Sequence, residues 1–375
     1  MSLTYFATAP KGLEQILANE LTSLGASSVS IGVGGVHFKG GVEVGYKANL
    51  WLRTAIRVLM RLRSFKANSP EALYDGVQTI DWSEFMSKDQ TLAISANVRD
   101  SELTHSHYVA LKTKDAIVDQ FREKTGERPS IDKQTPDLSI NVHIKQNKCI
   151  LSLDMSGASL HKRGYRLRGG KAPLSEALAA GILQLAGYDG QKPLHDLMCG
   201  SGTFAIEAAL MKHNIAPGLL RPSFGFQRWH SFDKSIWKEL SVQARRSIIG
   251  PADPTIFASD ISDQALKIAG ENADRAGVLD YILFQRTDFR KIAAPEKPGM
   301  VICNPPYGER LGELPRLREL YKDLGDHYKK VFRGHLGCIF TGNLELIKKV
   351  GLKPKNRHVL YNGPLESRLV VYELY

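Results

Sequence analysis

The pattern of hydrophobic and polar positions differs between the two halves of the chain. In the first half, short segments with every second residue apolar indicate half-buried strands, and longer segments with apolar residues every three or four positions indicate amphipathic helices. The segment 138–156, for example, predicts two strands that turn at Gln146 and Asn147. We expect two small α+β units, over 1–66 and 67–156.

From Leu174 onward, continuous apolar segments of strand length alternate with helical segments. This alternation is typical of a parallel sheet, because the chain returns through a helix after each strand. Asn362 and Gly363 separate two β-rich runs, a hairpin signal. We therefore predict an α/β, Rossmann-like seven-stranded sheet, doubly wound and closed by an antiparallel pair. The remaining expected strands are 193–198, 255–262, 282–289, 299–303 and 336–342, and the expected helices are 174–187, 203–214, 263–277 and 317–331.

A basic segment lies between the two halves. Residues 157–173 read GASLHKRGYRLRGGKAP, with four glycines, one tyrosine and no acidic residue. Glycine-rich charged segments serve as flexible linkers, and basic segments with an aromatic residue can also bind a phosphate backbone. We expect an inter-domain linker here, and RNA contact is an equal alternative for its cations. These cations are Lys162, Arg163, Arg166, Arg168 and Lys171.

The net charge of +11 is distributed unevenly. Residues 1–156 carry 18 basic and 17 acidic residues, whereas residues 157–375 carry 32 and 22. Neutralisation of phosphates dominates the affinity of proteins for nucleic acids, so the surplus in the second half favours a polyanionic partner. A basic surface that serves only solubility is the alternative.

Composition excludes several classes of protein. A chain of 375 residues is long enough for two or three domains. It has no apolar run of the roughly 18 to 20 residues that cross a bilayer, and its N-terminus lacks a secretion signal, so we expect a cytoplasmic protein. The four cysteines are scattered, which favours buried, reduced thiols and no metal site. They are Cys149, Cys199, Cys303 and Cys338.

The first candidate site is the segment DLMCGSGTFAIEAAL. A strand ends at Asp196, Gly200 and Gly202 form a tight turn, and a helix starts near Thr203 with its free N–H groups. The same glycines fit the loose dinucleotide pattern, so a nicotinamide-dependent enzyme is an alternative. Two features oppose that alternative. No acidic residue follows at about 20 residues, where the ribose would be bound, and Asp196 would repel a pyrophosphate but suits a cation.

Acidic residues also end the next two strands. Asp260 can accept hydrogen bonds from both hydroxyls of a ribose, and Asp288 can accept one from an adenine amine while Phe289 packs on the ring. Each acid alone could be a helix N-cap or a turn residue. Acids at three successive strand ends, however, lie at the edge where open α/β sheets bind ligands.

A further buried strand stops abruptly at NPPYG. Asn304 offers a side-chain carbonyl, Pro305 offers a backbone carbonyl, and Pro306 helps to stiffen the loop. Two converging carbonyls can hold a primary amine on a flat ring, and Tyr307 can stack on that ring. Accepting both N–H groups makes the conjugated nitrogen more nucleophilic, an example of catalysis by preorganised dipoles. A simple Asn-Pro turn is the alternative.

In order, DLMCGSGT, SDIS, TDF and NPPYGER resemble the motifs of class I S-adenosylmethionine-dependent amino-methyltransferases. The stretches GYRLRGGKAPLSEALAA and FGFQRWHSFD resemble a subgroup with an N-terminal ferredoxin-like unit and a THUMP domain, whose members methylate N2 of guanine in bacterial 23S ribosomal RNA. The resemblance implies a ferredoxin-like unit over 1–66, an RNA-binding THUMP domain over 67–156, a linker over 157–173 and a class I methyltransferase domain over 174–375.

The resemblance also implies partners and residue roles. The cofactor would be S-adenosyl-L-methionine, the product S-adenosyl-L-homocysteine, and the substrate 23S rRNA or a large-subunit precursor particle, with neither metal nor membrane. The target amine would be held by Asn304, Pro305, Pro306 and Tyr307. The cofactor would contact Asp196, Cys199, Gly200, Gly202, Thr203, Asp260, Ile261, Asp288, Phe289 and Asn304.

Two other functions stay open. The tetrapeptide NPPY also occurs in adenine-N6 DNA methyltransferases, so it does not distinguish guanine N2 from adenine N6. An RNA-binding protein without catalytic activity is the second alternative. Some relatives carry another methyltransferase domain at the C-terminus, and because this sequence ends at Tyr375 we expect that second activity to be absent.

Overall fold

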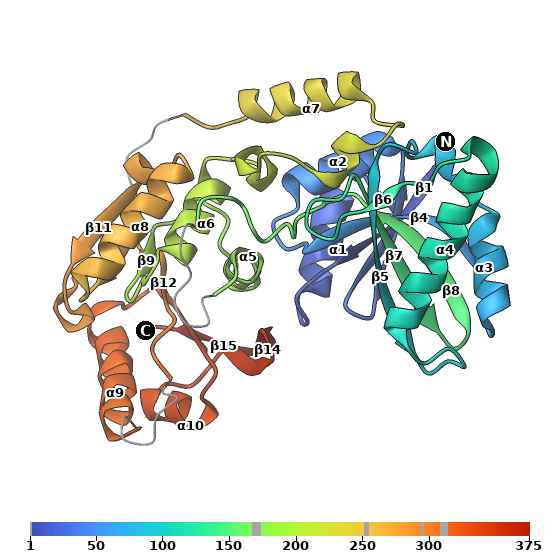
Figure 1. Ribbon diagram of the computed structural model, residues 1–375. Helices are drawn as coiled ribbons and strands as arrows, with labels where there is room; N and C mark the ends of the chain where they lie inside the picture. Colours follow the sequence, from blue (N-terminus) through green and yellow to red (C-terminus); the bar gives the residue numbers. More distant parts are fainter. Residues whose placement is uncertain (1, 167–173, 251–254, 294–295, 308–313) are drawn as a thin grey trace. The chain divides into compact units, whose positions relative to one another are not determined.

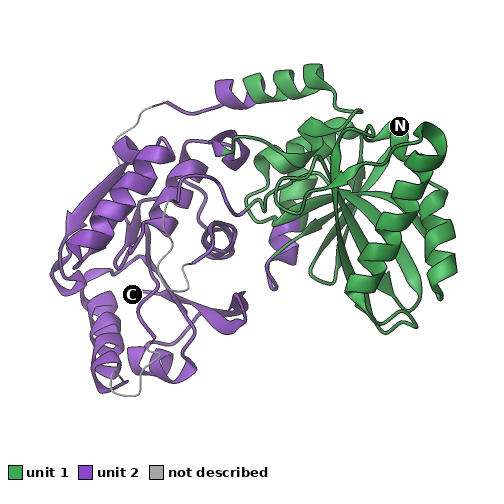
Figure 2. Ribbon diagram, viewed as in Figure 1, with its two compact units in different colours: residues 1–9, 18–160, 221–242 green, residues 10–17, 161–220, 243–375 purple. Residues whose placement is uncertain are grey.

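The computed structural model describes residues 2–166, 174–250, 255–293, 296–307 and 314–375. The chain forms two compact units, which are coloured separately in Figure 2. Unit 1 contains residues 1–9, 18–160 and 221–242, and unit 2 contains residues 10–17, 161–220 and 243–375. Each unit therefore includes a segment from the other half of the sequence. Every helix in the described part of the chain is too short or too polar to cross a lipid bilayer.

Unit 1 is built on one eight-stranded sheet with the order β2-β3-β1-β4-β8-β7-β5-β6. Figure 1 labels β1, β4, β5, β7 and β8 of this sheet. The two units expected over 1–66 and 67–156 share this sheet, because β4 pairs with β8 in antiparallel fashion. The strands are β1 (Leu3–Thr8), β2 (Ser27–Gly32), β3 (Gly35–Gly40), β4 (Arg57–Lys66), β5 (Thr91–Arg99), β6 (Ser130–Ile131), β7 (Leu138–Lys145) and β8 (Lys148–Asp154).

The core of unit 1 lies on one face of this sheet. Along β7 every second side chain is buried, and helices α2, α3 and α4 pack against strands of the sheet. The intervening residues of β7 are half-buried or exposed, and His37 and Lys39 of β3 are exposed. The sheet thus has a covered apolar face and a polar face. The helices of this part of the sequence are α1 (Glu14–Ser23), α2 (Val42–Trp51), α3 (Pro70–Gln78) and α4 (Ser106–Thr125).

Residues 221–242 complete the core of unit 1. Phe226 is fully buried, and its ring stacks on Tyr46 with 4.4 Å between the ring centroids. The backbone N–H of Asp233 donates a hydrogen bond to the Tyr46 hydroxyl at 3.0 Å. Trp237, in helix α7 (Lys234–Arg246), adds an edge-to-face contact with Phe226. This segment follows one strand and two helices of unit 2 in the sequence, so the chain leaves unit 1 and later returns to it.

Unit 2 contains a seven-stranded sheet with the order β11-β10-β9-β12-β13-β15-β14. The first five strands of this order are parallel, and β15 runs antiparallel to both β13 and β14. The predicted Rossmann-like sheet with an antiparallel closing pair is confirmed. The strands are β9 (Leu194–Asp196), β10 (Ile256–Asp260), β11 (Ile282–Arg286), β12 (Met300–Cys303), β13 (Leu336–Thr341), β14 (Asn356–Asn362) and β15 (Leu365–Glu373).

Two predicted hairpins are present. β7 and β8 are joined by Gln146 and Asn147, whose φ angles of 48° and 61° are the left-handed values that a tight hairpin requires. β14 and β15 pair from Asn362 with Leu365, and Gly363 in the connection has a φ of 61°. Residue types that tolerate positive φ therefore mark both turns in the sequence.

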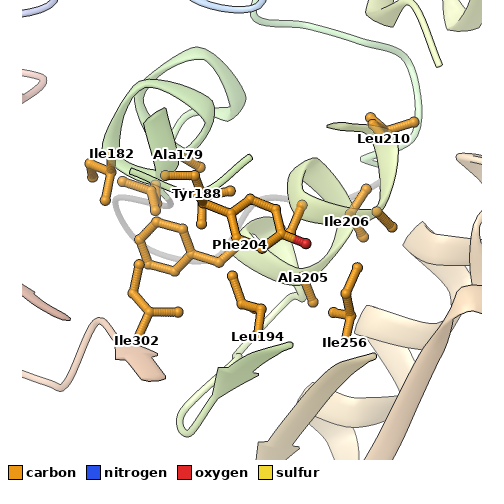
Figure 3. Close-up of a cluster of buried hydrophobic side chains, with 14 of the residues drawn as sticks. Ala179, Ile182, Tyr188, Leu194, Phe204, Ala205, Ile206, Leu210, Ile256 and Ile302 are labelled. Atoms are coloured by element: carbon orange, nitrogen blue, oxygen red, sulfur yellow. The ribbon is translucent and has the colours of Figure 1, made fainter. Parts of the chain in front are cut away.

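Strand β12 shows why its segment is continuously apolar. Met300 and Ile302 belong to a core cluster with helices α5 and α6, and Figure 3 shows Ile302 in that cluster. Val301 and Cys303 belong to a second cluster with helix α9 on the opposite face. Since both faces are covered, every side chain of the strand is buried. The helices of unit 2 are α5 (Glu176–Leu185), α6 (Thr203–Lys212), α8 (Asp263–Arg275), α9 (Leu314–Val331) and α10 (Leu344–Ile347).

Candidate active site

The strand order of unit 2 places β9 in the middle of the parallel strands, between β10 and β12. From β9 the chain adds β10 and β11 on one side of β9, and it then crosses to the other side to add β12 and β13. The strand order therefore reverses between β9 and β12. Open α/β sheets bind ligands outside the carboxyl ends of the strands at this point. Asp196 ends β9, Asp260 ends β10, Asp288 follows β11 and Asn304 follows β12. All four predicted site residues thus lie along one edge of the sheet.

The glycine loop between β9 and α6 needs residues without side chains. Gly200 and Gly202 have φ angles of 54° and 82°, in the left-handed region that glycine favours. A Cβ atom on Gly202 would also lie 3.0 Å from the Cβ of Ala269 in α8. On the same helix, the buried Asn272 donates a side-chain hydrogen bond to the Ser201 carbonyl at 3.0 Å. Asn272 therefore fixes the loop, a role that its sequence context does not reveal.

Asp260 ties the glycine loop to the start of α8. One carboxylate oxygen accepts the backbone N–H of Gly200 at 3.0 Å, and the other accepts the N–H of Ser262 at 2.9 Å. The neighbouring Ile261 is 68% exposed, which is unusual for a large apolar side chain at a strand end. The carboxylate is thus held in one orientation beside an exposed apolar surface.

Asp196 is a buried carboxyl with little compensation. The residue is 1% exposed, and neither carboxyl oxygen has a hydrogen-bond partner among the described residues. Burial raises the pKa of Asp196 to about 8; the backbone N–H of Met198 offsets part of this shift, and the charge of Asp260 adds to it. The group is therefore largely protonated at neutral pH, and a cation placed beside it would favour its ionised form.

The thiol of Cys199 lies in the same loop. Burial raises its pKa well above the ordinary value, and the nearby carboxyl groups of Asp196 and Asp260 raise it further. Nucleophilic cysteines need a lowered pKa, so Cys199 fills space in the loop and is not an activated nucleophile.

Asp288 and Phe289 have structural contacts within the domain: Asp288 caps a short helix, and Phe289 packs in the core. Asp288 caps the short helix η5 (Phe289–Lys291) by accepting the N–H of Arg290 at 3.0 Å, and its carboxylate pairs with the Arg290 guanidinium at 2.9 Å. The Phe289 ring is 3% exposed and packs in the second core cluster with Leu197 and Val301. The expected packing of this ring on a ligand is corrected, because the ring has no free face.

The Asn-Pro-Pro-Tyr loop follows β12. The side-chain oxygen of Asn304 is buried and accepts no hydrogen bond from any described residue, Pro305 is buried, and Tyr307 is half-buried. The backbone carbonyl of Tyr307 accepts the side-chain N–H of Asn343 at 3.2 Å. The other end of that amide accepts the N–H groups of α10 at its first turn. A rigid helix end thus holds the loop.

Asn343 was not among the predicted site residues. The signal for it was present, because the apolar strand LGCIFT is followed directly by Gly-Asn, and its carboxyl end lies at the same edge as that of β12. An asparagine at this position is also a typical helix N-cap.

The basic segment between the halves is partly a core element. Arg163 is 1% exposed and faces the fully buried Glu207 of α6 at 3.6 Å, and the buried Tyr165 donates a hydrogen bond to the same carboxylate at 3.2 Å. Arg166 donates hydrogen bonds to the Leu174 carbonyl and the Thr203 hydroxyl, each at 2.8 Å. The expected RNA contact is therefore wrong for Arg163. Lys162 is exposed, whereas Arg168 and Lys171 lie outside the described residues.

The described residues contain no cluster of side chains that could hold a metal ion. No three side chains of His, Cys, Asp or Glu gather there as ligands of one ion would. The site consists instead of carboxyl and amide oxygens at strand ends and a glycine loop at a helix N-terminus.

Three families match successive parts of the chain. Residues 4–59 match the RlmL ferredoxin-like domain, residues 67–154 match the THUMP domain, and residues 163–370 match the RMKL-like methyltransferase domain. The order of these matches is the order that the motifs imply.

Individual proteins are similar over the whole chain. A protein of Synechocystis sp., named as a candidate RNA methyltransferase, is 43% identical over 371 residues, which are 99% of this chain and 97% of that protein. The ribosomal RNA large subunit methyltransferase K/L of Methylococcus capsulatus is 44% identical over 380 residues, covering 100% of this chain and 52% of that protein. This chain thus spans about half the length of the K/L protein.

A solved structure gives the same result at the level of the fold. The crystal structure of SMU.472, a candidate methyltransferase in complex with SAH, superposes with a TM-score of 0.91 at 30% identity, covering 100% of this chain and 98% of that one. The fold, the motifs at its ligand-binding edge and the match over more than half of the sequence agree, and the chain belongs to the RMKL-like methyltransferase family.

Proposed function

We propose that this chain transfers a methyl group from S-adenosyl-L-methionine to the exocyclic N2 amine of a guanine in 23S ribosomal RNA. The observation that carries the proposal is the Asn304 side-chain oxygen at the end of β12, a buried acceptor that receives no hydrogen bond from the residues that the structure describes. A primary amine supplies the missing N–H. The K/L relative acts on large-subunit ribosomal RNA by name, and the THUMP match supports an RNA substrate.

The residues at the sheet edge fit the proposed cofactor. The unpaired carboxyl of Asp196 suits a positively charged group, and the free N–H groups at the start of α6 suit a carboxylate. Asp260 lies at the next strand end, where it can meet ribose hydroxyls, and the exposed Ile261 can cover a flat ring. The cofactor supplies, when bound, a methyl group already activated on a sulfonium sulfur.

The chain's own residues then position the amine. The Asn304 side-chain oxygen and the Pro305 carbonyl accept its two N–H groups, and the Tyr307 ring stacks on the base. This arrangement directs the nitrogen lone pair at the methyl carbon, and such alignment can supply several kcal/mol of the barrier reduction. The nitrogen–carbon bond forms as the sulfur–carbon bond breaks, and the nitrogen then loses one proton to water.

The target base has to leave its stack to reach Asn304, at an energetic cost of a few kcal/mol. Contacts elsewhere on the RNA can offset this cost. We assign such contacts to the THUMP domain, predicted over 67–156, and to the exposed Lys162 beside the methyltransferase domain, predicted over 174–375.

Methyl transfer into RNA tests the proposal. The purified chain is incubated with the donor labelled in its methyl group and with ribosomal RNA, or large-subunit particles, from a strain that lacks the protein. The RNA is then digested to nucleosides and analysed by mass spectrometry. We expect labelled N2-methylguanosine, and none with Asn304→Ala. Labelled N6-methyladenosine, or transfer to duplex DNA and not to RNA, would contradict the proposal.

A further inference from the structure

We propose that the polar face of the eight-stranded sheet in unit 1 binds a single-stranded segment of the RNA substrate. The inference rests on the proposed function, because it takes the polyanion to be RNA. It assigns the contact to a defined groove, which we call the sheet groove. Its titratable lining residues are His37, Lys39, Arg61, His143, Lys145 and Lys148.

The sheet groove is large and crosses the boundary between the two predicted N-terminal domains. Its volume is about 730 Å³, and its lining comes from the adjacent strands β2, β3, β1, β4, β8 and β7. Neighbouring strands lie about 4.8 Å apart, so six strands make a surface roughly 24 Å wide. The pairing of β4 with β8 makes this surface continuous, so neither domain forms the groove alone.

The charges of the sheet groove are all of one sign. Lys39, Arg61, Lys145 and Lys148 line it, and among the described residues no aspartate or glutamate does. In the described part of the chain, none of these four cations forms an ion pair, although many other surface cations do. The Nε of Arg61 is buried and has no hydrogen-bond partner there. Four uncompensated cations on one concave surface are complementary to a chain of phosphates.

The two histidines give the surface flat, neutral rings. Burial lowers the pKa of His37 and of His143, and the nearby Arg61 and Lys145 respectively lower them further. A neutral imidazole offers one donor, one acceptor and a stacking face. The His37 ring also lies 4.6 Å from the Phe6 ring, which makes an aromatic platform on this face of β1 and β3.

A single strand fits these features better than a duplex. Single-stranded RNA exposes its bases, which stack on aromatic and imidazole rings while the backbone follows a basic groove. An open sheet presents such rings side by side, whereas the bases of a duplex are already stacked.

Binding of a labelled RNA oligonucleotide to the full chain tests the inference. The probe is an unstructured uridine oligonucleotide of about ten residues, within the range of roughly 4 to 16 known for single-strand sites. Its affinity is measured by fluorescence anisotropy as a function of salt. The test variant is Lys145→Gln with Lys148→Gln. The matched control is Lys88→Gln with Lys124→Gln, two surface lysines of unit 1 outside the sheet groove.

Each phosphate contact of a single strand contributes about 0.7 to the slope of log affinity against log salt. Loss of two contacts should therefore lower the slope by about 1.4. The ratio of wild-type to variant affinity should then be about 25-fold larger at 0.1 M salt than at 1 M salt. The control should keep the wild-type slope, and Lys145→Arg with Lys148→Arg should restore it. An unchanged slope in the test variant, or equally tight binding of a duplex of the same length, would overturn the inference.

The same variants distinguish this inference from the proposed function. If wild-type chain methylates RNA and the test variant keeps its KM for RNA, the methyltransferase proposal stands and the groove is refuted. If the test variant loses oligonucleotide binding but neither it nor the wild-type chain transfers methyl groups to RNA, RNA binding by the sheet groove is supported and the proposed reaction is refuted.

Discussion

The Asp196→Asn substitution separates the charge of the buried carboxyl from its shape. Burial raises the pKa of Asp196 from an ordinary 3.8 to about 8. In the unfolded chain the carboxyl is ionised above about pH 4, whereas in the folded chain it keeps its proton until about pH 8. Asparagine has nearly the same volume and does not ionise, so only the wild type carries this difference between the two states.

The sign and size of the effect follow from the proton count. Between about pH 4 and pH 8 the unfolded wild type binds fewer protons than the folded wild type at this position, so its free energy of unfolding falls as pH rises. One pKa unit corresponds to about 1.4 kcal/mol, and the folded-state carboxyl is already half ionised at pH 8, so it should cost roughly 2 kcal/mol of stability between pH 6 and pH 8. Above pH 8 the loss stops because both states are ionised. The variant lacks this loss.

Urea denaturation at pH 6 and pH 8 measures the difference. All four tryptophans, Trp51, Trp82, Trp229 and Trp237, lie in unit 1, whereas Asp196 lies in unit 2. Far-UV circular dichroism reports both units, and tryptophan fluorescence provides the control from unit 1. The amide of asparagine also lacks partners, so the informative quantity is the change with pH. If wild type and variant differ by the same free energy at both pH values, the raised pKa is refuted.

Three further substitutions test the site and the core. Asn304→Ala should reduce turnover about 100-fold or more, as loss of a preorganised dipole does, with unchanged calorimetric affinity for S-adenosyl-L-methionine; normal turnover would contradict its role. Asp260→Ala should weaken that affinity by about 2 to 3 kcal/mol, because charge-assisted hydrogen bonds are lost; unaltered affinity excludes the ribose contact. Arg163→Ala leaves Glu207 as a buried unpaired charge and should cost about 3 to 5 kcal/mol in urea denaturation, whereas Arg163→Met with Glu207→Leu should restore most of it.

The sheet of unit 2 could be predicted because local signals agree with the fold. A strand that is buried on both faces is a continuous apolar run, and the carboxyl ends of parallel strands meet at one edge. Asp196, Asp260 and Asn304 follow such runs, so their alignment at that edge follows from strand direction alone. The packing of Phe289 into the core did not follow, because an aromatic residue after a strand can face either a ligand or a helix.

The basic residues show where sequence reasoning fails. A cluster of arginines in a glycine-rich segment indicates an exposed surface. Arg163 is nevertheless buried, because it pairs with the buried Glu207, which lies 44 residues later on α6. The charge count of residues 1–156, with 18 basic and 17 acidic residues, gives no sign of a basic surface there. The cations of the sheet groove alternate with apolar residues along several strands, and only strand pairing brings them to one face.

The return of residues 221–242 to unit 1 has a consequence for biosynthesis. Phe226, which stacks on Tyr46, is translated 180 residues after its partner, when β9 and α6 of unit 2 have already been made. Until the segment emerges from the ribosome, Tyr46 of the N-terminal unit therefore lacks the aromatic rings that cover it in the folded chain. Proteins in that state expose apolar surface to chaperones and to neighbouring nascent chains. The order of translation thus couples maturation of the first unit to synthesis of the second.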